Sequence, residues 1–392
     1  MNKNIRALAE IAQKKQRRII GLMSGTSLDG LDIAVCSLSG AGIHTEITVE
    51  DFETIPYWDP FREKLRGICF KENSSLKKLT LFHKEIAETH ARLVNIFLET
   101  RNIDKTTVDL IASHGQTLYH IPAGTGTAAA TLQAGDGDHL AVQTGIITVS
   151  DFRQKNIAGG GQGAPLAAYG DLLLFKEKDT DVMLLNIGGI ANFTYLPAEG
   201  PLICSDTGPG NALMNAWMHM HFPGKDFDED GVLAAKGHII EPLLAALKDH
   251  PFFHAVLPKT TGPELFNISF VENILTQTGN EKATDEDIMA SLNKFTADTI
   301  AEAVKKVVGE KKYKLYVSGG GIHNPVLIRH LEETLPGATF LSVTEKGIPP
   351  DAKEAVLFAL LANECVAGDP GSFNVEGANL PAVSMGKISF PY

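Results

Sequence analysis

The segment Gly25-Thr26-Ser27-Leu28-Asp29-Gly30 combines residue types that can hold a phosphate group. Its two glycines let the backbone turn sharply and approach a ligand closely, while Thr26 and Ser27 offer hydroxyl and N–H donors to phosphate oxygens. Asp29 can hold Mg²⁺ directly or through a water molecule. The GxxxxGK(S/T) pattern of a P-loop is absent, so the alternative interpretation is an ordinary hairpin turn with a bulge.

Two further glycine clusters follow apolar runs that predict strands. Gly188-Gly189 ends the run that starts at Asp181, and Gly319-Gly320-Gly321 follows the strand-like run KLYVS. Asn324-Pro325 then predicts a helix start, because asparagine caps helices and proline fits their first turn. Glycine turns at strand ends in both halves of the chain predict two phosphate hairpins and one loop under a nucleoside.

The elements that must position these turns indicate a duplicated α/β framework. The segment 18–38 predicts a strand, a tight loop and a strand, and 181–197 repeats this pattern. Helical periodicity predicts long helices over 76–101 and 285–308. Strand candidates over 108–112 and 146–150 end in the polar runs SHGQT and DFR, at the strand ends where open α/β sheets usually place ligands.

Two carboxylates are candidates for acid–base chemistry. Asp206 lies in DTGPGN, just before a helical pattern over 211–221, and its alternative role is the N-cap of that helix. Glu354 lies in DAKEA, where it also completes a capping box that begins at Asp351.

Length, composition and charge limit the protein class. At about 100–200 residues per domain, 392 residues predict two domains, and 44% hydrophobic with 21% charged residues is typical of globular proteins. The net charge of -12 disfavours a protein that binds nucleic acid or anionic membranes by bulk charge. The four cysteines show no ligand spacing, and no apolar run reaches the 18 residues of a membrane span. We therefore expect a cytoplasmic protein without nucleic-acid or membrane partners.

The glycine clusters resemble those of the sugar kinase, actin and chaperone ATPase superfamily, and within it the motifs resemble those of bacterial anhydro-N-acetylmuramic acid kinases. The motifs, in the family's order, are GLMSGTSLDGLD (21–32), ASHGQT (112–117), LQAGDGDHLA (132–141), SDFR (150–153), AGGGQGAPL (158–166), NIGGIAN (186–192), DTGPGN (206–211), SGGGIHNP (318–325) and DAKEA (351–355). The resemblance implies two similar actin-like (ribonuclease H-like) α/β domains with an active-site cleft between them. We expect an extension at 1–18, a first domain over 19–150 plus about 375–392, and a second over 151–374.

The resemblance also implies the reaction and its cofactors. With ATP and Mg²⁺, the family opens the 1,6-anhydro bridge of its sugar hydrolytically and phosphorylates O6. The products are N-acetylmuramic acid 6-phosphate and ADP, in the recycling of cell-wall peptidoglycan.

The resemblance also implies roles for individual residues of the motifs. Asp206 falls on the position of the catalytic aspartate that deprotonates water, and Glu354 is a second catalytic candidate. The expected ATP contacts are Gly25, Thr26, Ser27, Leu28, Asp29, Gly30, Leu31, Asp32, Gly188, Gly189, Gly319, Gly320, Gly321 and Asn324, with Asp29 also a metal ligand. The expected sugar contacts are His114, Gln116, Gln133, Asp136, Arg153, Gly208 and Asn211.

Several alternatives stay open at the level of sequence. His114 can be a satisfied structural histidine, Asp136 a turn-stabilising aspartate, and Arg153 either a partner of the lactyl carboxylate or of a phosphate, or one half of a structural salt bridge. The substrate can be another 1,6-anhydro sugar such as levoglucosan, or the chain can be a non-catalytic ATP-driven switch of the actin and chaperone type. A homodimer is one option for the assembly.

Overall fold

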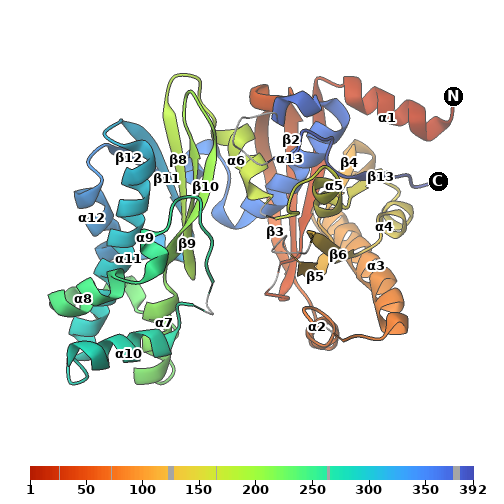
Figure 1. Ribbon diagram of the computed structural model, residues 1–392. Helices are drawn as coiled ribbons and strands as arrows, with labels where there is room; N and C mark the ends of the chain where they lie inside the picture. The colour runs from red at the N-terminus through yellow and green to blue at the C-terminus, as the bar shows by residue number, and fades with distance from the viewer. Residues whose placement is uncertain (26, 72, 122–127, 165, 263–264, 374–379) are drawn as a thin grey trace. The chain divides into compact units, whose positions relative to one another are not determined.

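The computed structural model of the chain describes residues 1–25, 27–71, 73–121, 128–164, 166–262, 265–373 and 380–392. The chain divides into two compact units, a first unit of Met1–Leu174 with Lys346–Tyr392 and a second unit of Phe175–Glu345. Each unit is built around its own mixed β-sheet (Figure 1).

The sheet of the first unit has the strand order β13-β7-β4-β1-β2-β3. Its strands are β1 (Gln16–Met23), β2 (Gly30–Ser39), β3 (Glu46–Pro56), β4 (Leu110–Ser113), β7 (Thr148–Ser150) and β13 (Lys387–Ser389). β1, β2 and β3 are antiparallel neighbours, whereas β4 and β7 continue the sheet parallel to β1. The strand–loop–strand pattern predicted over 18–38 is confirmed.

The sheet of the second unit has the strand order β10-β9-β8-β11-β12. Its strands are β8 (Asp181–Ile187), β9 (Ile190–Leu196), β10 (Ile203–Pro209), β11 (Tyr313–Ser318) and β12 (Ala338–Ser342). β8, β9 and β10 are antiparallel, and β11 and β12 run parallel to β8. Both sheets therefore share the order 3-2-1-4-5 of ribonuclease H-like domains, and the predicted duplicated α/β fold is confirmed. The predicted cleft between the units stays a prediction.

Helices cover the sheets. Those of the first unit are α1 (Lys3–Gln13), α2 (Asp59–Arg66), α3 (Leu76–Thr100), α4 (Gly137–Thr144), α5 (Phe152–Ala158), α6 (Ala167–Phe175, which ends at the first residue of the second unit) and α13 (Lys353–Ala367), beside the hairpin of β5 (Gln116–Ile121) and β6 (Ala130–Ala134). Those of the second unit are α7 (Ala212–His221), α8 (Glu241–Lys248), α9 (Pro251–His254), α10 (Ile268–Thr278), α11 (Asp285–Val308) and α12 (Pro325–Thr334). The long helices predicted over 76–101 and 285–308 are confirmed as α3 and α11. No helix in the described part of the chain is long and apolar enough to cross a membrane.

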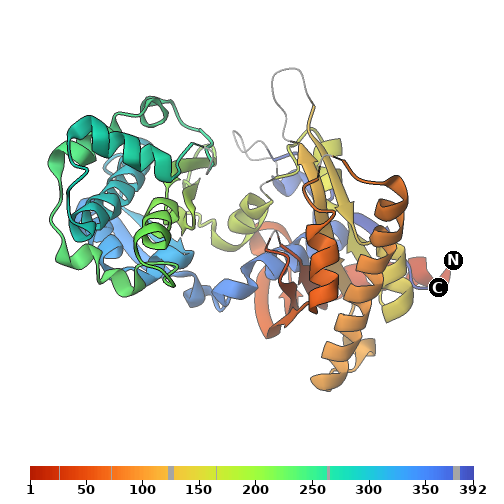
Figure 2. The same ribbon diagram turned by 90° about the horizontal axis from the view of Figure 1, so that it is seen from below.

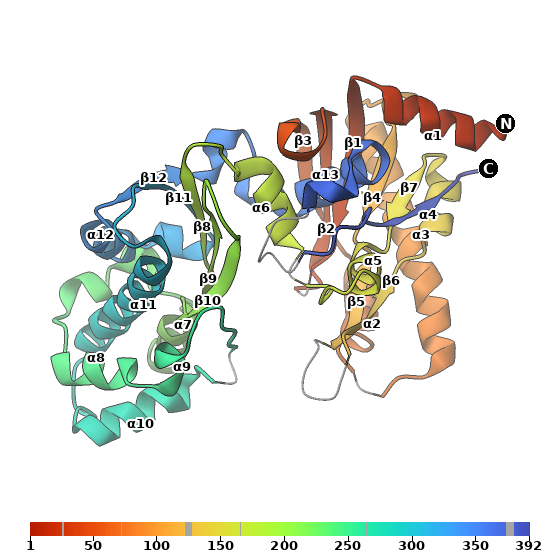
Figure 3. The ribbon, with the colours of Figure 1, turned by 45° about the horizontal axis from the view of Figure 1, so that its top comes forward.

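The core of the first unit lies between the sheet and α3, the long orange helix of Figure 2. Ile20 and Leu22 of β1 pack there with Phe82 and Ile86 of α3. Because strand side chains alternate between faces, the residues between them point to the other face, which α13 covers. In the second unit buried side chains of β8 pack with those of α11 and α12 in one core. Figure 3 shows the ribbons of these elements in the second unit.

The unit boundaries differ from those that the sequence predicted. Residues 151–174 and 346–374 were expected in the second domain, but they belong to the first unit. The reason is packing: α5 lies against β6, and α13 lies against β1, β2 and β4.

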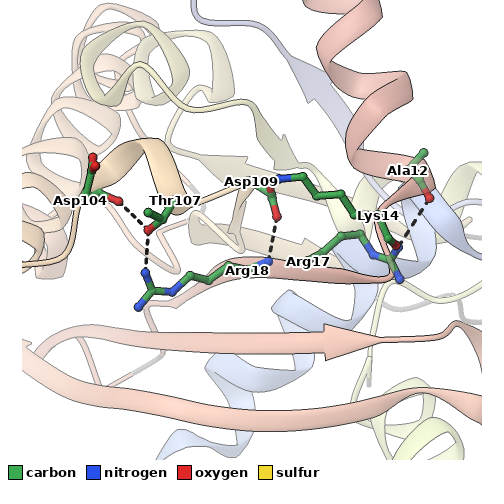
Figure 4. A network of polar contacts seen from close by, with 7 residues as sticks. All are labelled: Ala12, Lys14, Arg17, Arg18, Asp104, Thr107 and Asp109. Atoms are coloured by element: carbon green, nitrogen blue, oxygen red, sulfur yellow. Dashed lines mark hydrogen bonds and ion pairs between the residues drawn. The ribbon is translucent and has the colours of Figure 1, made fainter.

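The N-terminal residues are an integral part of the first unit. Residues 1–18, predicted as an extension, include α1 and the start of β1. Arg17 donates from Nη1 to the carbonyl of Lys14 at 2.6 Å, and the N–H of Arg18 donates to Asp109 Oδ2 at 2.9 Å (Figure 4). Lys14 also pairs with Asp109, so the end of α1 is tied to the start of β4.

The packing of α13 on β1 generates a test of the first unit. A Cβ atom on Gly21 would lie 1.9 Å from the carbonyl oxygen of Ala355, so Gly21→Ala must push α13 away from the sheet. We expect a loss of about 1–3 kcal/mol in the free energy of unfolding, measured as a melting temperature lower by several degrees. Gly67→Ala is the matched control, because its Cβ would meet only ordinary contacts at 3.4 Å. Equal melting temperatures for the two variants would contradict the close packing.

Candidate active site

The first glycine turn joins β1 to β2 and is anchored by its leucines. Leu28 adopts a left-handed backbone with φ of 58°, and its side chain is buried in the core of the first unit. Leu31 is fully buried in the same core, so neither leucine offers its side chain to a ligand. Thr26 lies outside the described residues. We call the described residues of this turn, Ser24, Gly25 and Ser27–Asp29, the first hairpin.

Side chains from the turn between β4 and β5 hold the backbone of the first hairpin. Gln116 accepts from Ser24 Oγ at 2.6 Å through Oε1 and donates to the carbonyl of Gly25 at 3.3 Å through Nε2. His114 Nδ1 lies 3.2 Å from the carbonyl oxygen of Ser24. Both side chains are buried, and these bonds confirm a structural role; their contact with a sugar stays a prediction.

Arg153 fixes the protonation state of His114. The guanidinium donates from Nε to His114 Nε2 at 2.9 Å and from Nη1 to the carbonyl of Gly163 at 3.0 Å. Because arginine can only donate, His114 Nε2 accepts and Nδ1 carries the proton, which it donates to Ser24. Burial, together with the charge of Arg153, lowers the pKa of His114 to about 3, so the ring is neutral at physiological pH.

Three carboxylates lie near the first hairpin. Asp29 is exposed and accepts from Ser27 Oγ at 2.6 Å, and Asp32 accepts from Thr54 Oγ1 at 2.6 Å. Burial and the neighbouring Asp32 charge raise the pKa of Glu354, against the opposing effect of Arg153, although part of its side chain reaches solvent.

The capping box predicted for Glu354 does not form. Helix α13 begins at Lys353 with Ala352 in the N-cap position, and no side chain in the described residues caps it. Asp351 instead belongs to a preceding 3₁₀ turn, Pro350–Ala352. The alternative structural role for Glu354 is therefore wrong, and its catalytic role stays a prediction.

Asp136 is a helix cap. Its Oδ1 accepts from two backbone N–H groups at the start of α4, and His83 Nε2 lies 3.4 Å from its Oδ2. Burial raises the pKa of Asp136, but the bond from the His139 N–H and the His83 ring outweigh it, so the net pKa is lowered. Gln133 accepts from Thr117 Oγ1 at 3.0 Å. The turn-stabilising role of Asp136 is confirmed, and sugar contact by Asp136 and Gln133 stays a prediction.

The second glycine turn, Gly188-Gly189, joins β8 to β9 and is held by backbone bonds. The N–H of Gly210 donates to the carbonyl of Gly189 at 2.8 Å, and the N–H of Asn211 donates to that of Gly188 at 2.8 Å. Asn211 Nδ2 also lies 3.3 Å from the carbonyl oxygen of Ile187. The DTGPGN segment thus supports this turn, which we call the second hairpin.

The third glycine loop is shaped partly by packing. A Cβ atom on Gly319 or Gly321 would lie 2.7 or 2.3 Å from atoms of Ile187, so the fold itself requires glycine at both positions. Asn324 Oδ1 caps α12 by accepting from the N–H of Leu327 at 3.1 Å, as the sequence predicted. A nucleotide contact by any of these residues stays a prediction.

Four glycines have no such structural requirement. Gly25, Gly188, Gly189 and Gly320 avoid the left-handed backbone region, and an added Cβ atom would meet its nearest neighbour at 3.6–3.9 Å. These distances are ordinary van der Waals contacts. Close approach of a ligand to the bare backbone at these positions stays a prediction.

Asp206 lies at an irregularity of β10. The pairing with β9 shifts between Asp206 and Gly208, which leaves Thr207 as an extra residue, and such bulges re-aim a side chain. Asp206 Oδ2 accepts from the N–H of Thr261 at 2.8 Å, and its own N–H donates to the carbonyl of Lys259 at 2.9 Å. Within the described residues, Oδ1 receives no hydrogen bond. One carboxylate oxygen is fixed and the other is open.

The alternative N-cap role of Asp206 is wrong. Helix α7 begins at Ala212, and Asn211 occupies its N-cap position. Burial raises the pKa of Asp206 more than the bond from Thr261 lowers it, so this carboxylate is a stronger base than an ordinary aspartate.

Sequence reasoning missed the segment that holds Asp206. Lys259 N–H donates to Ser205 Oγ at 3.0 Å, and Lys259 Nζ donates to the carbonyl of Phe252 at 2.7 Å while it lies 4.2 Å from the centre of that ring. Burial and the charge of Lys306 lower the pKa of Lys259 to about 8. Backbone groups form the contacts with Asp206, and they leave no signal in residue type.

Gly208, two residues after Asp206, is required by the fold. Its φ is 140°, and a Cβ atom would lie 2.7 Å from the Phe253 ring. Its predicted contact with a sugar stays a prediction.

A comparison with protein families decides the identity. The family model described as anhydro-N-acetylmuramic acid kinase matches residues 17–391. The chain belongs to the anhydro-N-acetylmuramic acid kinase family. The kinase uses ATP to phosphorylate a small sugar, in the recycling of peptidoglycan, so the predicted activity is confirmed and the ATP-driven switch is excluded.

Similar proteins span the whole kinase. The anhydro-N-acetylmuramic acid kinase of Pseudoalteromonas atlantica is 46% identical and that of Pseudoalteromonas translucida 44%, each over 100% of both chains. A solved structure, component A of the (R)-2-hydroxyglutaryl-CoA dehydratase of Acidaminococcus fermentans, covers 89% of this chain and 99% of its own with 12% identity and a TM-score of 0.43. The fold assignment rests on the strand order of the two sheets.

The hairpin glycines give a direct test of nucleotide binding by the kinase. At Gly25 and Gly189 an added Cβ atom meets only ordinary contacts at 3.9 Å. Gly25→Val and Gly189→Val therefore place a branched side chain where it would block a phosphate at the backbone. We expect each variant to keep its melting temperature and to bind ATP roughly tenfold or more weakly, by isothermal titration calorimetry. Unchanged ATP affinity in both variants would show that neither hairpin binds phosphate.

Proposed function

We propose that Asp206 is the base that activates water when the kinase opens anhydro-N-acetylmuramic acid. The observation that carries this role is the pair of unlike oxygens: Oδ2 is held by the Thr261 N–H, while Oδ1 has no donor within the described part of the chain. A general base needs a free oxygen, a fixed orientation and a pKa that favours proton uptake. Asp206 meets all three requirements.

The reaction balances with one base. Asp206 takes a proton from water as the water oxygen bonds to C1 of the sugar and the C1–O6 bond breaks. The released O6 then bonds to the γ-phosphorus of ATP, and ADP leaves with the electrons of the broken P–O bond. Glu354, whose pKa is also raised, is the second carboxylate that we assign to proton transfer.

The two hairpins fit the task of binding ATP phosphates through backbone N–H groups. Gly25 and Gly189 leave the backbone bare, and Ser27 adds a hydroxyl beside the first turn. The third loop, with Gly320 beside Asn211, is our candidate for the nucleoside.

The residues of the first hairpin fit Mg²⁺. Magnesium in nucleotide sites is usually held by one or two carboxylates together with phosphates and water. Asp29 is exposed at the end of the hairpin, and Asp32 lies on the adjoining strand. Among the described residues no group of three histidine, cysteine, aspartate or glutamate side chains could hold a metal alone. A magnesium ion that is held partly by phosphates and water does not need such a group. The ion would neutralise charge on the phosphates.

Arg153 is our candidate for the lactyl carboxylate of the sugar. Its Nε and Nη1 atoms are occupied by His114 and Gly163, which fix the plane of the guanidinium. A fixed guanidinium can bind a carboxylate with geometric specificity through its remaining N–H groups. We also propose that the kinase is cytoplasmic and forms a homodimer.

The base assignment predicts the behaviour of Asp206→Asn. The amide keeps the shape and can still accept from Thr261, but it lacks basicity, so turnover should fall by roughly 10² or more. Melting temperature and ATP affinity should stay unchanged, measured by thermal unfolding and calorimetry. Near-normal turnover would mean that another carboxylate is the base. Water labelled with ¹⁸O should deliver its oxygen to C1 of the product, and label in the phosphate would contradict the proposed reaction.

The pH profile of kcat/KM gives a second test of the same base. The carboxylate is active when deprotonated, so the rate should fall as the pH drops through its pKa. Because burial raises that pKa, the acid limb should lie above the ordinary aspartate value of about 3.9. Asp206→Asn should lose this limb. A variant that retains the same acid limb would assign it to a different group.

Arg153→Ala tests the contact with the lactyl group. If the guanidinium pairs with that carboxylate, the variant should lose at least roughly tenfold more kcat/KM on anhydro-N-acetylmuramic acid than on anhydro-N-acetylglucosamine, which lacks it. The second sugar controls for the lost contacts with His114 and Gly163. Equal losses on both sugars would place Arg153 at a phosphate or in a structural role.

A further inference from the structure

Tyr57 bridges the two arms of the first hairpin. It follows Pro56, the last residue of β3, which pairs with Gly30 at the hairpin's end. The N–H of Tyr57 donates to the carbonyl of Asp29 at 2.9 Å, and its hydroxyl donates to Ser24 Oγ at 2.9 Å. Only 3% of the residue is exposed, so one buried side chain and its own backbone clasp both ends of the loop.

The hydrogen bonds behind the hairpin have a single direction. Ser24 spends its only hydroxyl proton on Gln116 Oε1, so it must accept from Tyr57. Tyr57 has then used its own proton, and His90 Nε2, 2.8 Å from the Tyr57 oxygen, must donate to it. Gln116 completes the series by donating to the carbonyl of Gly25. A chain of bonds thus leads from α3 to the backbone of the hairpin.

The burial of His90 is unfavourable for its ring nitrogens. The residue is fully buried on α3, its ring is parallel to that of Tyr57 at 6.1 Å, and burial lowers its pKa to about 4, so it is neutral. Its Nδ1 has no hydrogen-bond partner in the described residues. An apolar side chain would leave no such unpaired atom. What the histidine adds at this place is the donor for the Tyr57 oxygen.

We propose that Tyr57 and His90 are positioning residues for ATP: they lock the first hairpin in the conformation whose backbone N–H groups receive a phosphate. The inference rests on the proposed function, which assigns that hairpin to ATP. Without the lock the hairpin samples other conformations, and ATP must order it on binding. The sugar should bind with unchanged affinity.

Tyr57→Phe tests the inference because it removes one oxygen and keeps the ring. We expect the Kd and KM for ATP to rise about 3–10-fold, while the KM for anhydro-N-acetylmuramic acid stays within about twofold. The matched control is Tyr195→Phe in the second unit, where a residue that is 4% exposed donates from its hydroxyl to Asp181 Oδ2 at 2.6 Å. The control should lower the melting temperature and leave both KM values unchanged.

A double-mutant cycle asks whether Tyr57 acts through Ser24. The Ser24→Ala variant breaks the chain at the next residue, so Ser24→Ala with Tyr57→Phe should bind ATP no more weakly than the weaker single variant. His90→Leu should change ATP affinity in the same direction as Tyr57→Phe. Fully additive losses in the cycle would contradict a single chain.

The outcomes separate this inference from the proposed function. If Gly25→Val weakens ATP binding but Tyr57→Phe behaves like Tyr195→Phe, the positioning role is overturned and the hairpin assignment stands. Equal losses for ATP and sugar in Tyr57→Phe would also overturn the inference, because they indicate a general structural role. If Gly25→Val leaves ATP binding unchanged, the hairpin assignment itself fails.

Discussion

A loop that binds phosphate through its backbone must be held by bonds on its other side. N–H groups that are to receive a ligand cannot be used within the protein, and a glycine-rich loop without other support loses much conformational freedom on binding. Under the phosphate-binding role that we propose for the two hairpins, this constraint applies to both units of the kinase. In each, a hairpin between the first two strands of the sheet presents bare glycines, while residues from distant segments secure the carbonyl groups.

The two units meet this constraint with different chemistry. At the first hairpin, a side-chain N–H of Gln116 binds the carbonyl oxygen of Gly25, and one of His114 binds that of Ser24. Arg153 sets the tautomer of the histidine. At the second hairpin the backbone of Gly210 and Asn211 does the same work. The two kinds of support therefore differ in how they respond to amino-acid substitution. A side-chain support can be removed by one substitution, whereas a backbone support tolerates substitution as long as the segment keeps its path.

Sequence reasoning found the parts whose chemistry depends on residue type. The glycine turns, the strands beside them and Asp206 were visible because glycine, alternating apolar residues and an aspartate in DTGPGN are specific signals. Tyr57 and Thr261 were missed. Tyr57 follows the end of β3, far from the hairpin in the sequence, and Thr261 contributes only its backbone N–H. The boundary at residue 346 was missed because α13 is apolar on nearly all sides. Its place follows from the close approach of Ala355 to Gly21, which only the folded sheet reveals.

The position of Asp206 on a strand favours the role of base that we propose for it. At a helix N-cap a carboxylate accepts backbone N–H groups and faces the positive end of the helix dipole, both of which lower its pKa. Asp136 shows this effect in the same chain, with its pKa lowered despite burial. Among the described residues Asp206 accepts one N–H, from Thr261, and burial raises its pKa. The bulge in β10 therefore orients the carboxylate as firmly as a cap would, and it avoids the loss of basicity that a cap imposes.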